Sequence, residues 1–136
     1  MKRAKGFTLV ELVIVIVIVG ILSIVAVPLY RGYTRKSMAT EGRALLGTIQ
    51  TSEKVYFAEN GRFFPASNTA FNLELDVDAR GNKYFTTFGV SAVTTFGTAA
   101  TFTAWTSGYG GASGIGLTLF GKATGLASYS ATGLNS

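Results

Sequence analysis

The chain has 136 residues, enough for one domain of ordinary size. Only 14% of the residues are charged while 48% are apolar, a composition that excludes an intrinsically disordered chain. The sequence contains no His and no Cys, so it cannot form a Ser-His-Asp or Cys-His catalytic site, a thiolate or imidazole metal site, or a disulfide. We therefore expect no enzyme, no cofactor and no metal site.

The N-terminal part of the chain divides into a basic segment and an apolar one. The first six residues, MKRAKG, carry three positive charges, whereas the 21 residues from Phe7 to Val27 contain one charged residue, Glu11. A helix of this length, at about 1.5 Å per residue, reaches roughly 30 Å, the thickness of a bilayer core. An ordinary cleaved secretory signal has a shorter apolar core of about 7 to 15 residues. The segment is therefore predicted to span a membrane, while basic residues on both sides leave its orientation open.

Glu11 is the unusual residue of this segment. A carboxylate in an apolar helix costs about 2.5 to 3.5 kcal/mol near the middle of a membrane and less near its edge. If the chain is cut between Gly6 and Phe7, the new α-amine lies about 6 Å from Glu11 along the helix axis, or meets Glu11 of a neighbouring chain. The alternative is a carboxylate that reaches the interface or stays protonated.

The segment Lys5 to Tyr33, KGFTLVELVIVIVIVGILSIVAVPLYRGY, resembles the class III signal and first helix of type IV pilins and related pseudopilins. The shared features are a short basic leader that ends in Gly6, an aromatic residue after it, and Glu11 at the start of a long apolar run. The resemblance implies that a prepilin peptidase cuts between Gly6 and Phe7 and methylates the new amine of Phe7. It also implies that the leader lies in the cytoplasm and that Glu11 neutralises the amine of an adjacent subunit in a filament.

Two residues, one within the apolar run and one directly after it, are expected to weaken the helix. Gly20 lowers helix propensity by about 1 kcal/mol, and Pro28 removes a backbone donor and clashes with the preceding turn. We expect the stretch between them to be the most easily loosened part of the helix. The resemblance to pilins implies a loss of helical order there inside the filament, and a simple kink fits the sequence equally well.

Beyond the apolar run, apolar residues recur at a helical spacing that predicts one buried face. That face is formed by Leu45, Ile49, Ser52 and Tyr56. The charged residues assigned to the polar side are Arg31, Arg35, Lys36, Glu41, Arg43, Glu53 and Lys54. Arg31 and Arg35 are one turn apart and can meet lipid phosphates or acidic groups of another subunit. A nucleic-acid partner is not indicated, because a solvated helix face explains the basic cluster.

The helix is expected to end near Asn60 and Gly61, because Gly is the usual left-handed terminator. The Phe64-Pro65 pair then prevents continuation. The segment Tyr56 to Pro65, YFAENGRFFP, also resembles pilins, in which the long helix commonly ends in this way. The similarity therefore covers about the first half of the chain.

The part that follows the helix reads as a loop with one strand. Between Leu73 and Asp78, three apolar residues alternate with three acidic ones. The acidic residues lack the Gly and distal Glu of an EF-hand, so the alternation favours a strand over a calcium site. A turn is expected at Arg80 to Asn82.

After Lys83 the chain has one charged residue, Lys122, and is rich in Thr, Ser, Gly and aromatic residues, a composition that favours strands. The Gly-rich segment Ser107 to Gly116 argues against a long regular element and predicts a mobile hairpin connection. Many pilins close a C-terminal loop with a disulfide between two Cys. This chain has no Cys, so packing and hydrogen bonds must hold its C-terminal region. The expected strands cover Tyr84 to Phe96, Ala99 to Thr106, Ile115 to Phe120, and a fourth segment, Leu126 to Ser130.

The sequence thus predicts an α+β fold, in which a long N-terminal helix packs on a small antiparallel β-sheet, the shape that pilins have. The apolar half of the helix is expected to lie in a membrane or in a filament core. The expected segments are a leader over 1–6, the helix over 7–61 with its transmembrane or filament-core part over 7–27, a connecting loop over 62–82, and the sheet over 83–136.

The resemblance implies a major structural subunit of a type IV pilus, which polymerises through its apolar helix into an extracellular filament for adhesion, twitching motility or DNA uptake. The expected partners are further copies of itself, the inner membrane before assembly, the prepilin peptidase and the pilus assembly machinery. The alternatives are a pseudopilin of a type II secretion system, a minor pilin, and an inner-membrane DNA receptor. Major pseudopilins usually carry an acidic C-terminal loop, and the absence of acidic residues after Lys83 favours a pilin.

Overall fold

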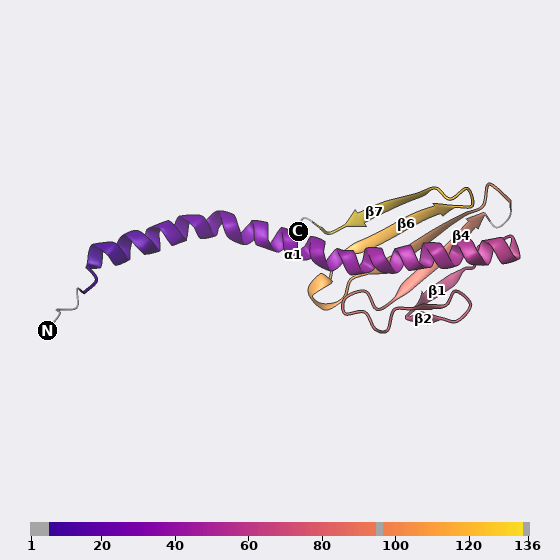
Figure 1. The fold of residues 1–136 in the computed structure, drawn as a ribbon, viewed down its shortest axis with the longest axis horizontal. Coiled ribbons are helices and arrows are strands. Elements are labelled where there is room, and N and C mark those ends of the chain that lie inside the picture. The colour runs from indigo at the N-terminus through magenta and orange to yellow at the C-terminus, as the bar shows by residue number, and fades with distance from the viewer. Residues whose placement is uncertain (1–5, 95–96, 135–136) are drawn as a thin grey trace. The chain divides into compact units, whose positions relative to one another are not determined.

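The structure is a computed structural model that describes residues 6–94 and 97–134. The chain forms two compact units, one up to Thr34 and one from Arg35 onward, and each is described by itself. One helix, α1 (Leu9–Asn60), contributes to both units. Figure 1 shows the ribbon and the element labels.

The first unit consists of the apolar part of α1 and the residues before it. Every large apolar side chain from Leu9 to Leu29 is exposed. The helix is long and apolar enough to cross a membrane, with a mean hydropathy of 3.2 over an 18-residue stretch of which 0% is buried. So much apolar surface is unfavourable in water, so this part of α1 requires lipid or other protein chains around it.

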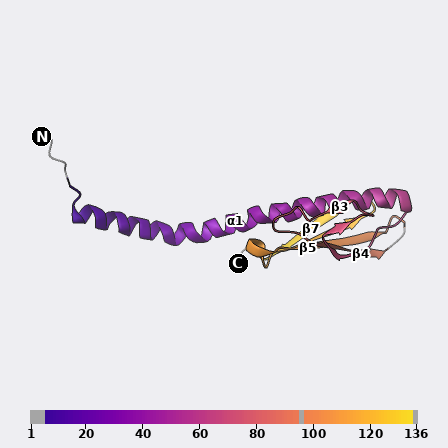
Figure 2. The ribbon, with the colours of Figure 1, turned by 90° about the horizontal axis from the view of Figure 1, so that it is seen from below.

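In the second unit, the rest of α1 packs on one face of a five-stranded antiparallel sheet with the order β1-β4-β5-β6-β7. Figure 2 shows this helix and sheet as two layers. A two-stranded sheet of β2 and β3 lies in the connection between β1 and β4. The predicted α+β fold is therefore confirmed. The strands are β1 (Ala66–Thr69), β2 (Phe71–Asn72), β3 (Val77–Asp78), β4 (Phe88–Thr94), β5 (Thr101–Ser107), β6 (Gly116–Lys122) and β7 (Ala127–Thr132).

Helix and sheet meet in an apolar core, to which α1 contributes residues at helical spacing and the strands contribute alternate residues. Leu45, Ile49 and Tyr56 of α1 are buried, as their helical spacing predicts. In β5, Phe102 and Ala104 point inward and are fully buried, while Thr103 between them faces away from the helix. Burial of a large apolar side chain contributes about 1.5 to 3 kcal/mol, so these positions dominate the stability of the second unit.

The polar side of α1 differs from the prediction at Glu53. This residue was assigned to the solvated side, but it is 0% exposed, whereas Ser52, assigned to the buried face, is half-buried. Glu53 follows Ile49 by one helical turn, so the spacing itself places it inside. The prediction placed Glu53 on the solvated side because it is charged, and at this position the prediction is wrong.

The end of the helix agrees with the sequence. α1 ends at Asn60, and Gly61 takes a φ of 69°. The Gly61 N–H donates to the carbonyl of Phe57 at 2.8 Å, which satisfies one of the last helical carbonyls. The left-handed termination at Gly61 is confirmed.

The strand predicted between Leu73 and Asp78 is wrong over most of its length. The Asn72 Oδ1 accepts the N–H of Leu75 at 2.9 Å, and Asp76 adopts a φ of 49°, so the chain turns instead of extending. Only the last two residues of the segment form a strand, β3, which pairs with β2. The turn predicted at Arg80 to Asn82 is present, with the Asn82 N–H donating to the carbonyl of Ala79 at 3.1 Å.

The C-terminal strands lie close to their predicted positions. β5, β6 and β7 each start within two residues of the predicted start, and β5 and β6 are joined by the Gly-rich hairpin connection, which contains a short 3-10 helix, η1 (Gly110–Ala112). The largest difference is in β4, which begins at Phe88 instead of Tyr84. The predicted end of that strand, Phe96, lies outside the described residues.

The variant Gly42→Ala is expected to lower the stability of the second unit. A Cβ at Gly42 would lie 2.5 Å from Cδ1 of Leu117 and 2.8 Å from Cδ1 of the fully buried Phe85. Such overpacking costs about 1 to 3 kcal/mol, more than the gain of about 1 kcal/mol in helix propensity. Thermal unfolding of the full chain in detergent measures the change.

Gly47→Ala is the matched control, because within the described part of the chain nothing lies within 4 Å of a Cβ at Gly47 in the same helix. This variant is expected to raise stability by up to about 1 kcal/mol. Equal and positive shifts in both variants would contradict the tight packing at Gly42.

Candidate functional site

The predicted cleavage point lies immediately before α1. Gly6 and Phe7 are exposed and have no regular secondary structure, and Phe7 is 84% exposed. Beyond its chain neighbours, no atom of the described residues lies within 4 Å of a Cβ position at Gly6. The peptide bond between them therefore has open surroundings, as close approach by a protease requires.

Thr8 and Glu11 form a reciprocal cap at the start of α1. The N–H and the hydroxyl of Thr8 both donate to Oε2 of Glu11, at 2.9 and 2.7 Å, and the Glu11 N–H donates to Oγ1 of Thr8 at 3.3 Å. This arrangement is a capping box, in which a Thr and a Glu three positions later satisfy each other's backbone donors. The Thr-x-x-Glu spacing is its sequence signal, and an interpretation of Glu11 by charge alone overlooks it.

The helix continues through Gly20 and Pro28. Because Pro28 has no N–H, the carbonyl of Ile24 loses its helical donor. The Ser23 hydroxyl donates to the carbonyl of Val19 at 2.7 Å, a contact that often bends helices. These features support the predicted weakness of the stretch, and its loosening in a filament stays a prediction.

Arg35 links α1 to two C-terminal segments of the second unit. Its Nε donates to the carbonyl of Gly133 at 3.0 Å, and its Nη2 donates to the carbonyl of Ser113 at 3.1 Å. Ser113 follows η1, and Gly133 follows β7. In a chain without Cys, this side chain holds the C-terminal region by hydrogen bonds. Of the two arginines predicted to meet lipid phosphates or acidic groups, Arg35 is thus engaged within its own chain.

Glu41 fixes the segment that leads into β4. Its Oε1 accepts the N–H groups of Tyr84 at 2.6 Å and Phe85 at 2.9 Å, and its Oε2 accepts that of Lys83 at 3.1 Å. Desolvation raises the pKa of Glu41. The three N–H groups and the charge of Lys83 together lower the pKa by more than desolvation raises it, so the pKa of Glu41 lies below its ordinary value. Because these amides bind Glu41, they do not join the sheet, and β4 begins only at Phe88.

The variant Glu41→Ala is expected to destabilise the second unit by about 2 kcal/mol, because it leaves three N–H groups without their acceptor. Chemical unfolding of the full chain in detergent measures the loss. Glu59→Ala serves as the control, since Glu59 is an exposed residue of the same helix and its carboxylate has no hydrogen bond within the described residues. Equal stability of the two variants would show that the Glu41 contacts contribute nothing.

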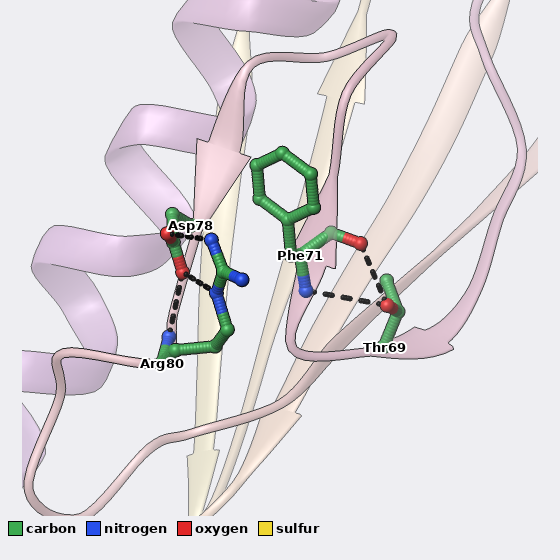
Figure 3. A network of polar contacts seen from close by, with 4 residues as sticks. All are labelled: Thr69, Phe71, Asp78 and Arg80. Atoms are coloured by element: carbon green, nitrogen blue, oxygen red, sulfur yellow. Dashed lines mark hydrogen bonds and ion pairs between the residues drawn. The ribbon is translucent and has the colours of Figure 1, made fainter.

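A second polar network closes the small β2–β3 sheet (Figure 3). Oδ1 of Asp78 accepts the N–H and the Nε–H of Arg80, both at 2.9 Å, and Oδ2 accepts from Nη2 at 2.6 Å. The Arg80 guanidinium also lies 4.5 Å from the ring centroid of Phe71. These hydrogen bonds from Arg80 lower the pKa of Asp78 to about 2. Thr69 bonds both backbone groups of Phe71, so the network holds β2 and β3 in place.

Glu53 is a buried carboxylate that contacts the start of the connection to β1. Its Oε2 accepts the N–H of Phe64 at 2.9 Å, and its Oε1 has no partner among the described residues. Burial raises the pKa of Glu53 to about 7, although the Phe64 N–H acts in the opposite direction. The carboxylate is therefore positioned to stabilise the fold when it is protonated and to destabilise it when it is ionised.

The acidic residues after the helix lie in two separate places. Within residues 6–94 and 97–134, no three carboxylates lie close enough to hold a metal ion. Asp78 pairs with Arg80, while Glu59, Glu74 and Asp76 line an open hollow of about 250 Å³ beside α1.

Comparisons with known proteins agree with this arrangement. Residues 1–27 match the prokaryotic N-terminal methylation motif. The chain is 38% identical over 121 residues to the fimbrial protein EcpC of Eikenella corrodens. This alignment covers 88% of this chain and 74% of EcpC. It is 40% identical over 80 residues to a fimbrial protein of Neisseria meningitidis, covering 59% of this chain and 46% of that protein. No solved structure matches the chain.

A further relative is the type IV major pilin protein PilA of Myxococcus xanthus, which is 36% identical over 83 residues, or 60% of this chain and 36% of that protein. The chain thus spans less than half the length of the Neisseria and Myxococcus relatives. The match to EcpC, in contrast, extends far beyond the N-terminal motif and into the sheet. With an exposed apolar stretch at the start of α1 and an antiparallel sheet in the second unit, the chain belongs to the type IV pilin family and is a pilus subunit with a class III signal peptide.

Proposed function

We propose that this chain is the major structural subunit of a type IV pilus and that α1 carries it from the inner membrane into the filament. The observation that carries the proposal is that every large apolar side chain from Leu9 to Leu29 is exposed. A helix satisfies its own backbone groups in lipid, so this surface suits a bilayer first and a bundle of like helices afterwards. The Myxococcus relative is a type IV major pilin protein by name, which supports this type of subunit.

Maturation begins with cleavage between Gly6 and Phe7 by a prepilin peptidase and methylation of the new Phe7 amine. The leader, 1–6, stays in the cytoplasm, segment 7–27 spans the inner membrane, and the residues after it lie outside. Loss of the leader removes three positive side chains and lowers the formal net charge from +5 to +2. The basic character of the precursor therefore belongs largely to the leader, where it favours retention on the cytoplasmic side.

Glu11 sets the axial position of a subunit in the filament. In the precursor its carboxylate bonds Thr8, directly beside the future N-terminus at Phe7. After cleavage it pairs with the N-terminal amine of an adjacent subunit. A subunit docked at a different height leaves both charges unpaired in an apolar core, at a cost of several kcal/mol per ion.

The residues after α1, which form both sheets and their connections, make up the outside of the filament and supply the surface for adhesion, twitching motility or DNA uptake. The named relatives are structural proteins, and we assign no catalytic role. The pilus assembly machinery extracts the subunit from the membrane.

Shearing of intact cells tests this proposal. The chain is expected to be the most abundant polypeptide of the sheared filaments, and loss of the prepilin peptidase should leave it in the membrane with its leader attached. A pseudopilin or a minor pilin would instead be absent or scarce in sheared filaments built from another subunit, and that result would reject the major-subunit role.

A further inference from the structure

An open, mostly apolar hollow of about 300 Å³ lies between α1 and β7 in the second unit, and we call it the β7 groove. Tyr129 of β7 donates its hydroxyl to Oε1 of Gln50 at 3.3 Å, which ties the strand to the helix beside it. The charged group of the groove is Arg43, which has no ion pair within the described residues. The groove is lined by Arg43, Leu117, Tyr129, Ser130 and Ala131.

A projection of complementary character lies in the turn between β2 and β3, residues 73–76, which we call the Leu73 turn. The Leu73 side chain is 77% exposed, although it is large and apolar. Glu74 and Asp76 are exposed in the same turn, and neither carboxylate has a partner within the part of the chain that the structure describes. The turn therefore presents one apolar side chain together with two unpaired negative charges.

The groove and the turn lie on opposite sides of α1. At about 100° per residue, Arg43 and Gln50 fall on one side of the helix. Of the helical residues beside the Leu73 turn, Ser52, Val55 and Glu59 fall on the other side. Figure 1 shows the same arrangement, with β7 and β2 on opposite sides of the helix. The two surfaces are thus placed to meet between neighbouring copies that share one orientation.

We propose that the Leu73 turn of one subunit docks into the β7 groove of a neighbouring copy, with Leu73 against the apolar wall and Glu74 paired with Arg43. The proposal rests on the proposed function, because two different surfaces that join head to tail generate an open, repeating assembly. It adds a contact between the outer units to the packing of the apolar helices.

The charges on the two sides of the helix support this pairing. The exposed Lys36 and Lys54 lie on the same side of α1 as Arg43 by helical spacing, so the groove side is basic. The opposite side carries the exposed Glu59 beside the acidic Leu73 turn. Complementary charge fixes register and excludes wrong partners, since like charges brought together cost several kcal/mol.

Charge reversal tests the contact in piliated cells. Arg43→Glu and Glu74→Lys, each alone, are expected to lower the yield of sheared pili about tenfold or more, and the double variant is expected to restore most of it. Lys122→Glu is the matched control, because this exposed residue lies on the face of β6 that points away from the helix. Mature subunit in the membrane at wild-type level shows that each variant folds. Full piliation of the single variants, or a double variant that stays defective, would overturn the proposal.

Crosslinking tests the contact directly, because the chain has no Cys of its own. Filaments with both Leu73→Cys and Ala131→Cys are expected to give a ladder of oxidised multimers, and either single variant is expected to give none. A crosslink to a polypeptide other than this chain would overturn the choice of occupant. If the wild type forms filaments but the variant with both cysteines gives no ladder, this contact alone is refuted. If the wild type forms no filaments, the proposed function and the contact are refuted together.

Discussion

The variant Glu11→Ala is expected to be cleaved and inserted normally but to form few or no filaments. Its cleavage point is unchanged, because Gly6 and Phe7 lie outside the helix. In the filament, however, an N-terminal amine would be left unpaired in an apolar core, at a cost of several kcal/mol for each subunit. Each 1.4 kcal/mol is a factor of ten, so we expect pilus yield to fall about a hundredfold or more. The ratio of subunit in sheared filaments to subunit in membranes measures this loss.

Glu11→Gln separates the two roles of this side chain. Gln can replace Glu in a capping box with Thr8, but it carries no charge. Thr8→Val makes the opposite change, since it removes the cap and keeps the carboxylate. We expect Glu11→Gln to be as defective as Glu11→Ala and Thr8→Val to assemble. Normal piliation of Glu11→Gln would show that the cap, not the charge, is what assembly needs.

The second unit is expected to become less stable as the pH rises from about 4.5 to about 7, because of Glu53. Burial raises its pKa from the ordinary 4.5 to about 7, so in this range the folded state binds a proton that the unfolded state releases. The linked loss of stability is about 3 kcal/mol, complete above the folded pKa. Glu53→Gln is expected to remove this dependence and to be the more stable protein at pH 8.

Denaturant unfolding of the full chain in detergent at pH 5 and pH 8 measures the difference. The single tryptophan, Trp105 of β5, reports on the second unit. Glu59→Gln, an exposed carboxylate on the same helix, should keep the wild-type pH dependence. Asp78 titrates in a separate, more acidic range, because its pKa is lowered to about 2. An unchanged pH dependence in Glu53→Gln would contradict the assignment to this residue.

The parts of the fold that could be predicted from the sequence are those set by local chemistry. Helical spacing located the buried face at Leu45, Ile49 and Tyr56, and the terminator at Gly61 ended the helix. Strand composition located β5, β6 and β7, because Thr and aromatic residues are enriched in strands. The basic leader and the apolar run likewise defined the N-terminal motif.

Two of the remaining features depend on contacts between distant residues. Glu41 displaces the start of β4 because it binds amides more than forty positions away, and Arg35 reaches carbonyls near the C-terminus. Glu53 is buried although it is a carboxylate, since the Phe64 amide meets it at the end of the helix. In the Leu73 turn, alternation favoured a strand, but the Asn72 side chain and the left-handed Asp76 turned the chain instead. No local pattern encodes the contacts of Glu41 and Arg35, whereas the turn at Asn72 is formed by residues three positions apart.

The mass spectrum of the mature N-terminus tests the central claim most directly. Subunits taken from sheared filaments are expected to begin at Phe7, to lack residues 1–6, and to carry one methyl group on the Phe7 amine. A filament subunit that retains Met1, or that begins beyond Glu11, would contradict the claim.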